Sequence, residues 1–297
     1  AMNLVFFDME GPLTPQDNAY ELMALWPGGR QVFEAISRYD DLLTLEGRPG
    51  YEPGDTLSLI VPFLLCHGTN TGTIKRMGEE AALVPGAQKL VRALHAQGWL
   101  VHAVTTSYAP FARAVADRVA IPQSKVACTA FPVERLDYWF PPEARRQVAE
   151  VEKELLSGDI RNDTWLRERL DRFYWQEATQ SKLDHVLRVV RPIGGTRKLV
   201  AVQAYSLAEG TALAQVVVVG DSITDAAMLR AVDQAGGRAV AFNANGYALP
   251  HATLGVVSGH IDDLVPIMEV WRARGPPGVR ARVEAPPATH EGSDQAT

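Results

Sequence analysis

Short, uninterrupted apolar runs, rich in β-branched residues, recur along the chain. The clearest lie at residues 3–7, 99–104, 216–219 and 238–242, and weaker ones lie at 125–129 and 254–257. Runs that are continuous rather than alternating are typical of strands buried on both faces of a parallel sheet. The pattern therefore predicts the strands of such a sheet.

Stretches with helical spacing separate these runs, at residues 87–97, 110–119, 199–207 and 225–234. Strands that alternate with helices of about ten residues predict an α/β fold with a Rossmann-like parallel sheet core. In such sheets, ligands bind outside the carboxyl ends of the strands. The polar residues that follow the apolar runs are therefore the first candidates for a functional site.

Two long segments interrupt this alternation. Residues 15–84 predict a mainly helical cap, with helices at 18–25, 29–38 and 55–66. Residues 131–195 predict a second helical insertion, with helices at 142–156 and 164–190. Insertions above a sheet often carry lids and specificity elements.

The remaining segments divide into a core and a tail. The core is expected to consist of residues 2–14, 85–130 and 196–274. Residues 275–297 contain two Pro-Pro pairs and little apolar surface to bury, so they predict a disordered tail.

Composition narrows the class of protein. The chain has 297 residues, 46% hydrophobic and 22% charged, which excludes a mostly disordered, collagen-like or coiled-coil protein. A net charge of −6 argues against broad nucleic-acid binding. Only two cysteines, Cys66 and Cys128, are present, which predicts a reducing compartment. No apolar run is long enough for a membrane span. We therefore expect a cytoplasmic protein without nucleic-acid or membrane partners, and leave monomer or homodimer open.

Two carboxylates follow the first strand. Asp8 comes directly after it and Glu10 stands two positions further. An aspartate can attack phosphorus, and a second carboxylic acid can protonate the leaving oxygen and later activate water. The alternative is a solvated turn, because Asp, Gly and Pro are common turn formers.

Four further residues could take part in catalysis, and for three of them a purely structural role is the alternative. Thr105 ends the second apolar run and could hold phosphate oxygens or simply cap a helix. Lys198 could offset crowded negative charge or be a surface lysine. Asp221 and Asp225 follow the run at 216–219 and could bind Mg²⁺, although Asp221 could also be only a helix cap.

The order and spacing of these residues resemble the four motifs of the haloacid dehalogenase-like (HAD) hydrolase superfamily. The first is a strand followed by Asp-x-Asp, matched by Asp8-Met9-Glu10, and the second a strand ending in Ser or Thr, matched by Thr105. The third motif is a lysine, matched by Lys198, and the fourth is Gly-Asp-x-x-x-Asp after a strand, matched by residues 220–225. The spacing between the last two motifs looks like that of phosphoserine-phosphatase-like members. The resemblance covers the core, about half of the chain.

The resemblance implies a role for each residue. Asp8 would be the nucleophile and a Mg²⁺ ligand, and Glu10 would be the general acid/base and offer its main-chain carbonyl to the metal. Thr105 and the Thr106 amide would hold the phosphoryl group, and Lys198 would neutralise it together with Asp8. Asp221 would bind Mg²⁺, with help from Asp225 directly or through water.

The first motif departs from the usual pattern. Its second carboxylate is Glu10 rather than Asp, and Pro12 stands where Thr is usual. Residues 8–15 nevertheless look like the Asp-x-Glu-Gly-Thr-Thr-Thr-Pro motif of enolase-phosphatases, in which a carboxylic acid is retained. The resemblance therefore implies a Mg²⁺-dependent phosphatase acting on a small phosphorylated metabolite. A non-catalytic binding module and a phosphotransferase to a non-water acceptor are the alternatives; a haloacid dehalogenase is disfavoured because it does not require the carboxylates of the fourth motif.

The insertions offer weaker candidates. Arg48, Tyr51 and His67 could contact a substrate, although a single His in such a segment is more often structural. Aromatic residues of the second insertion are expected to pack at helical spacing rather than line a cleft: Trp165, Phe173, Tyr174 and Trp175.

Overall fold

The computed structural model describes residues 3–177 and 183–274. The tail expected at 275–297 lies outside the described residues. The core is one six-stranded sheet in the order β3-β2-β1-β4-β5-β6, and every neighbouring pair is parallel. Its strands are β1 (Asn3–Phe7), β2 (Trp99–Tyr108), β3 (Val126–Thr129), β4 (Val216–Gly220), β5 (Arg238–Phe242) and β6 (Leu254–Val256). The predicted α/β, Rossmann-like fold is confirmed.

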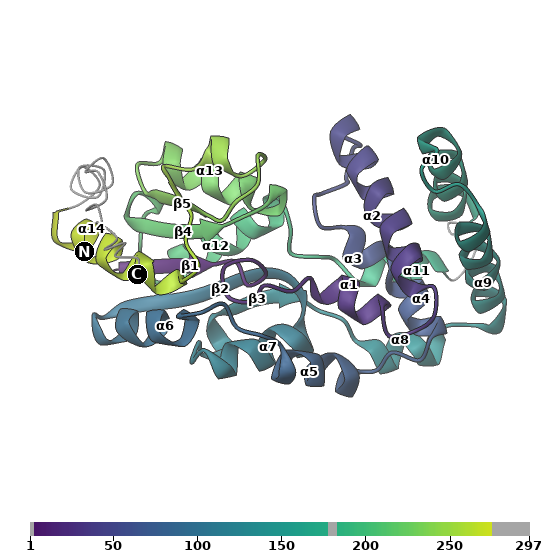
Figure 1. The fold of residues 1–297 in the computed structure, drawn as a ribbon, viewed down its shortest axis with the longest axis horizontal. Helices are drawn as coiled ribbons and strands as arrows, with labels where there is room; N and C mark the ends of the chain where they lie inside the picture. The colour runs from purple at the N-terminus through teal and green to yellow at the C-terminus, as the bar shows by residue number, and fades with distance from the viewer. Residues whose placement is uncertain (1–2, 178–182, 275–297) are drawn as a thin grey trace, which may run out of the picture.

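Helices cover both faces of this sheet (Figure 1). On one face lie α12 (Thr196–Ala208) and α13 (Ala226–Gln234), and on the other α6 (Ala87–Ala96), α7 (Ala109–Arg118) and α14 (Leu264–Arg274). The strands are apolar on both sides, as their sequence requires: Phe6 packs toward α12 and α13, and its neighbour Phe7 toward the opposite layer. Both phenylalanines are fully buried.

The segment between β1 and α6 is helical. It contains α1 (Asn18–Met23), α2 (Gly29–Glu46), α3 (Thr56–Leu59), α4 (Val61–Cys66) and α5 (Thr71–Glu80). The first four lie beyond the carboxyl end of the sheet, where Asn18 of α1 and Leu57 of α3 form hydrogen bonds with the end of β2, whereas α5 packs against α7 of the core (Figure 1). The expected cap over 15–84 thus has its last helix beside the core, and its boundaries stay a prediction.

The segment between β3 and α12 is helical as well. It contains α8 (Val133–Trp139), α9 (Pro142–Ser157), α10 (Asp163–Asp171), a wide π-helical turn (Arg172–Glu177) and α11 (Leu183–Val189). Helices α9 and α10 pack against α2, and α11 packs against α3 and α4. The two insertions therefore build one helical layer (Figure 1). Short 3₁₀ helices also occur in the described part of the chain, at Gln123–Lys125, Leu213–Gln215, Ile223–Asp225, Leu249–His251 and Ile261–Asp263.

Three predicted helices differ from the observed ones. The helix expected at 29–38 continues to Glu46, where Gly47 takes the left-handed conformation that ends it. The helix expected at 55–66 is two helices that meet at Ile60, because Pro62 has no N–H to continue the hydrogen-bond ladder. The helix expected at 164–190 is α-helical only to Asp171 and then widens into the π-helical turn, which buries both Phe173 and Tyr174; residues 178–182 of the expected helix lie outside the described residues.

Within the described ranges, no single helix is long and apolar enough to cross a membrane. The helical segments 56–66 and 71–80 together have the length and apolar composition of a membrane span, but the chain bends by 118° between them.

Candidate active site

The functional candidates meet at the carboxyl edge of the sheet. Asp8 leaves the end of β1 and its backbone N–H donates to the Val219 carbonyl of β4 at 2.8 Å. Asp221 follows β4 directly, and Thr106 lies near the end of β2 on the other side of β1. Because these three strands are neighbours, their carboxyl ends bring residues from distant parts of the chain together.

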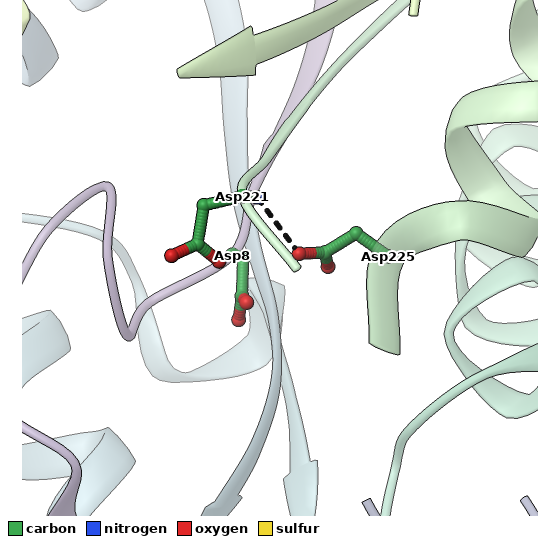
Figure 2. Close-up of side chains that lie close together, drawn as sticks. All are labelled: Asp8, Asp221 and Asp225. Atoms are coloured by element: carbon green, nitrogen blue, oxygen red, sulfur yellow. Dashed lines mark hydrogen bonds between the residues drawn. The ribbon is translucent and has the colours of Figure 1, made fainter. Parts of the chain in front are cut away.

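Three aspartates form a cluster at this edge. Asp8, Asp221 and Asp225 offer carboxylate oxygens that all lie within 4.8 Å of one another. Figure 2 shows the Asp8 and Asp221 carboxylates close together, with Asp225 on the other side of the chain that leaves β4. Asp8 is 3% exposed and Asp225 fully buried, while Asp221 is half-buried. Oxygen donors of this kind are the ligands that Mg²⁺ prefers.

Lys198, on α12, contacts two of the three aspartates. Its Nζ lies 2.8 Å from an Asp8 oxygen and 2.7 Å from an Asp225 oxygen, and its side chain is fully buried. Burial lowers the pKa of this lysine, but the Asp225 and Asp8 carboxylates outweigh that effect and hold the pKa above its ordinary value. Lys198 is therefore a permanent cation inside the site.

One buried lysine does not balance the surrounding acids. Burial, followed by repulsion from Asp225, raises the pKa of Asp8 well above its usual range. The same two causes raise the pKa of Asp221 to about 7. A divalent cation among these oxygens would return both groups to their ionised forms, so the donor set fits Mg²⁺ by both chemistry and charge.

Asp225 is held by hydrogen bonds at both oxygens. One oxygen pairs with Lys198, and the other accepts from the backbone N–H groups of Asp221 at 3.0 Å and Ser222 at 3.2 Å. Figure 2 shows the bond between Asp221 and Asp225. The Ser222 hydroxyl oxygen accepts from the backbone N–H of Asp225, and the two residues thus form a capping box. Asp225 thus fixes the lysine and the turn that carries Asp221.

Gly11 permits the close approach of the first-motif loop to Asp221. Its φ is +92°, and a Cβ built there would lie 2.1 Å from an Asp221 carboxylate oxygen. Only glycine combines this left-handed backbone with the absence of a side chain.

Glu10 lies in a hydrogen-bonded network under the cap. Its Oε1 accepts from the Ser107 hydroxyl at 2.6 Å, and Ser107 Oγ in turn accepts from Thr105 Oγ1 at 3.0 Å and Asn18 Nδ2 at 2.9 Å. Burial, followed by the nearby Asp17 charge, raises the pKa of Glu10 to about 8. Glu10 is therefore largely a carboxylic acid at neutral pH and can donate a proton.

The structure separates the two threonines of the second motif. The strand does not end before Thr105 as expected but continues to Tyr108, with its register against β3 shifting between Val104 and Tyr108. Thr105 is fully buried, bonds to Ser107 and does not line the cavity, whereas Thr106 does line it. The geometry thus favours the neighbouring threonine for contact with a ligand.

A cavity of about 340 Å³ opens beside these residues. Its walls come from the core and from the cap: Asp8, Glu10, Gly11, Pro15, Gln16, Asp17, Ala19, Phe33, Ser37, Asp40, Gly54, Thr56, Leu57, Thr106, Asp221, Ser222, Ile223 and Thr224. This volume is typical of a small-molecule site.

The cap reaches the site through the loop at residues 52–55. Glu52 accepts from the Thr196 backbone N–H at 3.0 Å, and Asp55 forms an ion pair with Arg197. Gly54 has φ +97°, and a Cβ there would lie 2.8 Å from Thr106 Cγ2. The loop is therefore seated against both the second motif and the residues that precede Lys198.

Sequence reasoning missed Ser107 and Asn18, the two hydrogen-bonding partners that join Glu10 to the cap and β2. Ser107 carried one signal, a hydroxyl directly after two threonines in a run that is otherwise apolar. Asn18 carried none, because its partner is 89 positions away.

The weaker candidates lie elsewhere. Arg48 and Tyr51 line a separate cavity of about 830 Å³, behind the loop at 52–55. His67 stacks on Trp26 with ring centroids 4.1 Å apart and bonds to Glu152 at 2.9 Å, which is a structural arrangement. Phe173 is buried in the helical layer, as expected. Tyr174 and Trp175, however, line the cavity of about 830 Å³, so the expectation that they only pack was wrong for these two residues.

No protein-family model and no curated protein matches the sequence. Among solved structures, gene product AF1437 from Archaeoglobus fulgidus is 28% identical with a TM-score of 0.85, covering 98% of this chain and 89% of that one.

Two further solved structures carry functional names. A phosphoserine phosphatase in its apo form is 12% identical with a TM-score of 0.56, covering 90% of this chain and 98% of its own. A HAD-family hydrolase from Salmonella enterica serovar Typhi is 12% identical with a TM-score of 0.57, covering 89% of this chain and 70% of its own. The chain therefore shares its fold with these two solved structures.

Proposed function

We propose that this protein is a Mg²⁺-dependent phosphomonoesterase of the phosphoserine-phosphatase-like branch, acting on a small phosphorylated metabolite. The observation that carries the proposal is the buried Lys198, paired with Asp8 and Asp225 next to a cavity that also receives Glu10. Burying such charges is costly, and clusters of shifted pKa values in a cavity are typical of catalytic sites. A scaffold that only binds a partner has no need of this arrangement.

The metal would be held by the carboxylates of Asp8 and Asp221, together with the main-chain carbonyl of Glu10. Asp225 would act on it indirectly, because its oxygens already serve Lys198 and two backbone N–H groups. When bound, Mg²⁺ supplies positive charge that offsets the phosphoryl and carboxylate oxygens.

The first half-reaction transfers the phosphoryl group to Asp8. A carboxylate oxygen of Asp8 attacks phosphorus, the bond from phosphorus to the ester oxygen breaks, and the electron pair stays on that oxygen. Glu10, protonated at neutral pH, donates its proton to the departing oxygen, so that a neutral alcohol leaves. Thr106 lines the cavity, and its hydroxyl would donate to a phosphoryl oxygen.

The second half-reaction releases phosphate. Glu10, now a carboxylate, takes a proton from water while the water oxygen attacks phosphorus. The bond from phosphorus to Asp8 breaks, and the aspartate returns to its starting form. Lys198 remains against Asp8 throughout and favours the carboxylate as the leaving group.

A hydrolysis screen tests the proposal. The purified protein with Mg²⁺ should release phosphate from a generic aryl phosphate and from at least one phosphorylated metabolite, and a chelator should abolish the release. Asp8→Asn, which keeps the size of the nucleophile, should lower the rate at least a thousandfold, whereas Asp41→Asn on the exposed side of α2 should not. A folded, metal-loaded protein that hydrolyses nothing would contradict the proposal, and product that forms only with an added acceptor would indicate a phosphotransferase.

A further inference from the structure

The part of the cavity contributed by the cap carries negative charge. In addition to Asp8, Glu10 and Asp221 at the catalytic end, Asp17 and Asp40 line the cavity wall. The lining residues all fall within the described ranges, and none of them is Lys, Arg or His. A ligand that reaches from the catalytic end toward the cap therefore enters a negative potential.

These two acids come from different helices of the cap. Asp17 is the N-cap of α1, at the open rim of the cavity. Asp40 belongs to α2, and it shares one face of that helix with Phe33 and Ser37, which line the same cavity. The cap thus presents two carboxylates and an aromatic ring to whatever group is attached to the phosphoryl ester.

Both carboxylates accept hydrogen bonds from neutral donors rather than from cations. Asp40 Oδ1 accepts from the Tyr51 hydroxyl, and Asp17 Oδ1 accepts from the Tyr20 backbone N–H at 3.0 Å. The ion pairs found in the described part of the chain include neither acid. Burial raises the pKa of Asp40 to about 6, so this group is still mainly an anion at neutral pH.

We infer that the substrate is a phosphomonoester of an amino alcohol, with an ammonium group that lies between Asp17 and Asp40 and with no carboxylate. This inference rests on the proposed phosphatase function. An ammonium group would supply a counter-charge to two carboxylates that have none among the described residues. It could also contact the Phe33 ring through a cation–π interaction. A substrate carboxylate would meet like charges with no cation to receive it, which is the condition for rejection. The cavity therefore disfavours phosphoserine, although phosphoserine phosphatases share this fold.

A matched substrate series tests the inference. O-phosphoethanolamine carries the ammonium, propyl phosphate replaces it by a methyl group, O-phospho-L-serine adds a carboxylate, and glycerol 1-phosphate offers hydroxyls instead. With saturating Mg²⁺, kcat/KM for O-phosphoethanolamine should exceed that for propyl phosphate at least tenfold, and O-phospho-L-serine should fall at least tenfold below O-phosphoethanolamine. Asp40→Asn and Asp17→Asn should each lower the ratio of ammonium to methyl substrate about tenfold.

Asp41→Asn is the matched control, since Asp41 is the exposed neighbour of Asp40 on α2 and does not line the cavity. It should leave the ratio unchanged. Asn is also a good N-cap, so Asp17→Asn keeps the start of α1 and serves as a second variant if Asp40→Asn does not fold.

Three results would overturn the inference: equal kcat/KM for the ammonium and methyl substrates, a preference for glycerol 1-phosphate, or a preference for O-phospho-L-serine. In each of these cases phosphate is released and the proposed function stands. The absence of hydrolysis of all four substrates and of a generic aryl phosphate would overturn the proposed function, and the inference with it.

Discussion

The ammonium group of Lys198 lies 2.8 Å from a carboxylate oxygen of Asp8, and the two side chains are 0% and 4% exposed. The same ammonium group contacts Asp225, which is fully buried. Two buried acids thus depend on one buried base. Removing the base leaves both buried acids without a counter-charge.

Lys198→Met should therefore reduce stability as well as activity. Breaking a buried ion pair on one side costs about 3–5 kcal/mol, because the remaining charge is uncompensated. Urea unfolding of the metal-free protein measures this cost. Lys89→Met is the control, since Lys89 pairs with Asp262 on the surface and its loss should leave the free energy of unfolding nearly unchanged. Equal effects of the two substitutions would show that the buried cluster does not carry the charge balance described here.

Gly11→Ala should disturb the site through steric contact. The new methyl group would lie 2.1 Å from the Asp221 carboxylate, so Asp221 must move. We expect Mg²⁺-dependent activity to fall by about a hundredfold or more, the scale on which small displacements act in catalysis. Gly98→Ala is the control: its φ is +81°, but nothing lies within 4 Å, so only backbone strain of about 1–2 kcal/mol should appear. Unchanged Mg²⁺ affinity and activity in the Gly11 variant would refute the close approach.

Ser107→Ala should lower kcat by about tenfold or more, because Glu10 loses the hydroxyl that holds its Oε1 at 2.6 Å. Steady-state kinetics with a generic aryl phosphate measures the change. Ser206→Ala removes another buried serine hydroxyl, which bonds only within α12, and should leave kcat as it is. If both variants keep full activity, Ser107 does not position the acid.

The two threonines of β2 should give separable effects. Thr106→Val removes the hydroxyl of a residue that lines the cavity and should lower kcat/KM about a hundredfold, the range found when a donor to a transition-state oxygen is removed. Thr105→Val leaves the buried Ser107 N–H without its acceptor and should cost about 1–3 kcal/mol of stability. Kinetics and urea unfolding on both variants check this pair. A larger loss of kcat/KM in Thr105→Val than in Thr106→Val would indicate that Thr105, and not Thr106, contacts the phosphate.

His102 should make the fold sensitive to acid. It lies between Phe6 and Tyr205, with ring centroids 4.8 Å and 4.7 Å away, and its buried Nε2 has no hydrogen-bond partner among the described residues. Burial, followed by the charge of Lys125, lowers the pKa of His102 to about 4. Between pH 6.5 and 4 the unfolded state therefore binds the proton that the folded state refuses, and stability falls as the pH falls.

His102→Phe keeps an aromatic ring at this place and removes the titration. From pH 7 to pH 5, the stability of the wild type should fall relative to that of the variant by about 2 kcal/mol, as a shift of this size implies. Denaturant unfolding of both proteins at the two pH values gives the difference, and other titrating groups cancel in it. A constant difference between pH 7 and 5 would mean that His102 is not held neutral.

The sheet could be predicted from the sequence because its information is local. The runs at 3–7 and 238–242 match β1 and β5 residue for residue, since continuous apolar segments of this length have few other uses. The helix over 55–66 was predicted wrongly because apolar periodicity outweighed one residue, Pro62, that blocks the hydrogen-bond ladder.

The candidate site could be predicted in outline but not in detail. The spacing of Asp8, Lys198 and Asp221 carried the resemblance, and the structure brings all three to one edge of the sheet. The roles of the two threonines depend on the irregular register between β2 and β3 after Val104, and no residue type in the sequence predicts that irregularity. The bond from Ser107 to Glu10 spans 97 positions and depends on packing that only the folded chain provides.

The cap loop and the catalytic lysine are parts of one mechanical unit. The loop at 52–55 holds Thr196 and Arg197, the two residues directly before Lys198. The first turn of α12, which carries Lys198, is therefore held by contacts from the cap as well as from the core. The same short loop also contributes Gly54 to the cavity wall, so one segment of the cap supports both the shape of the cavity and the position of the ammonium group beside Asp8.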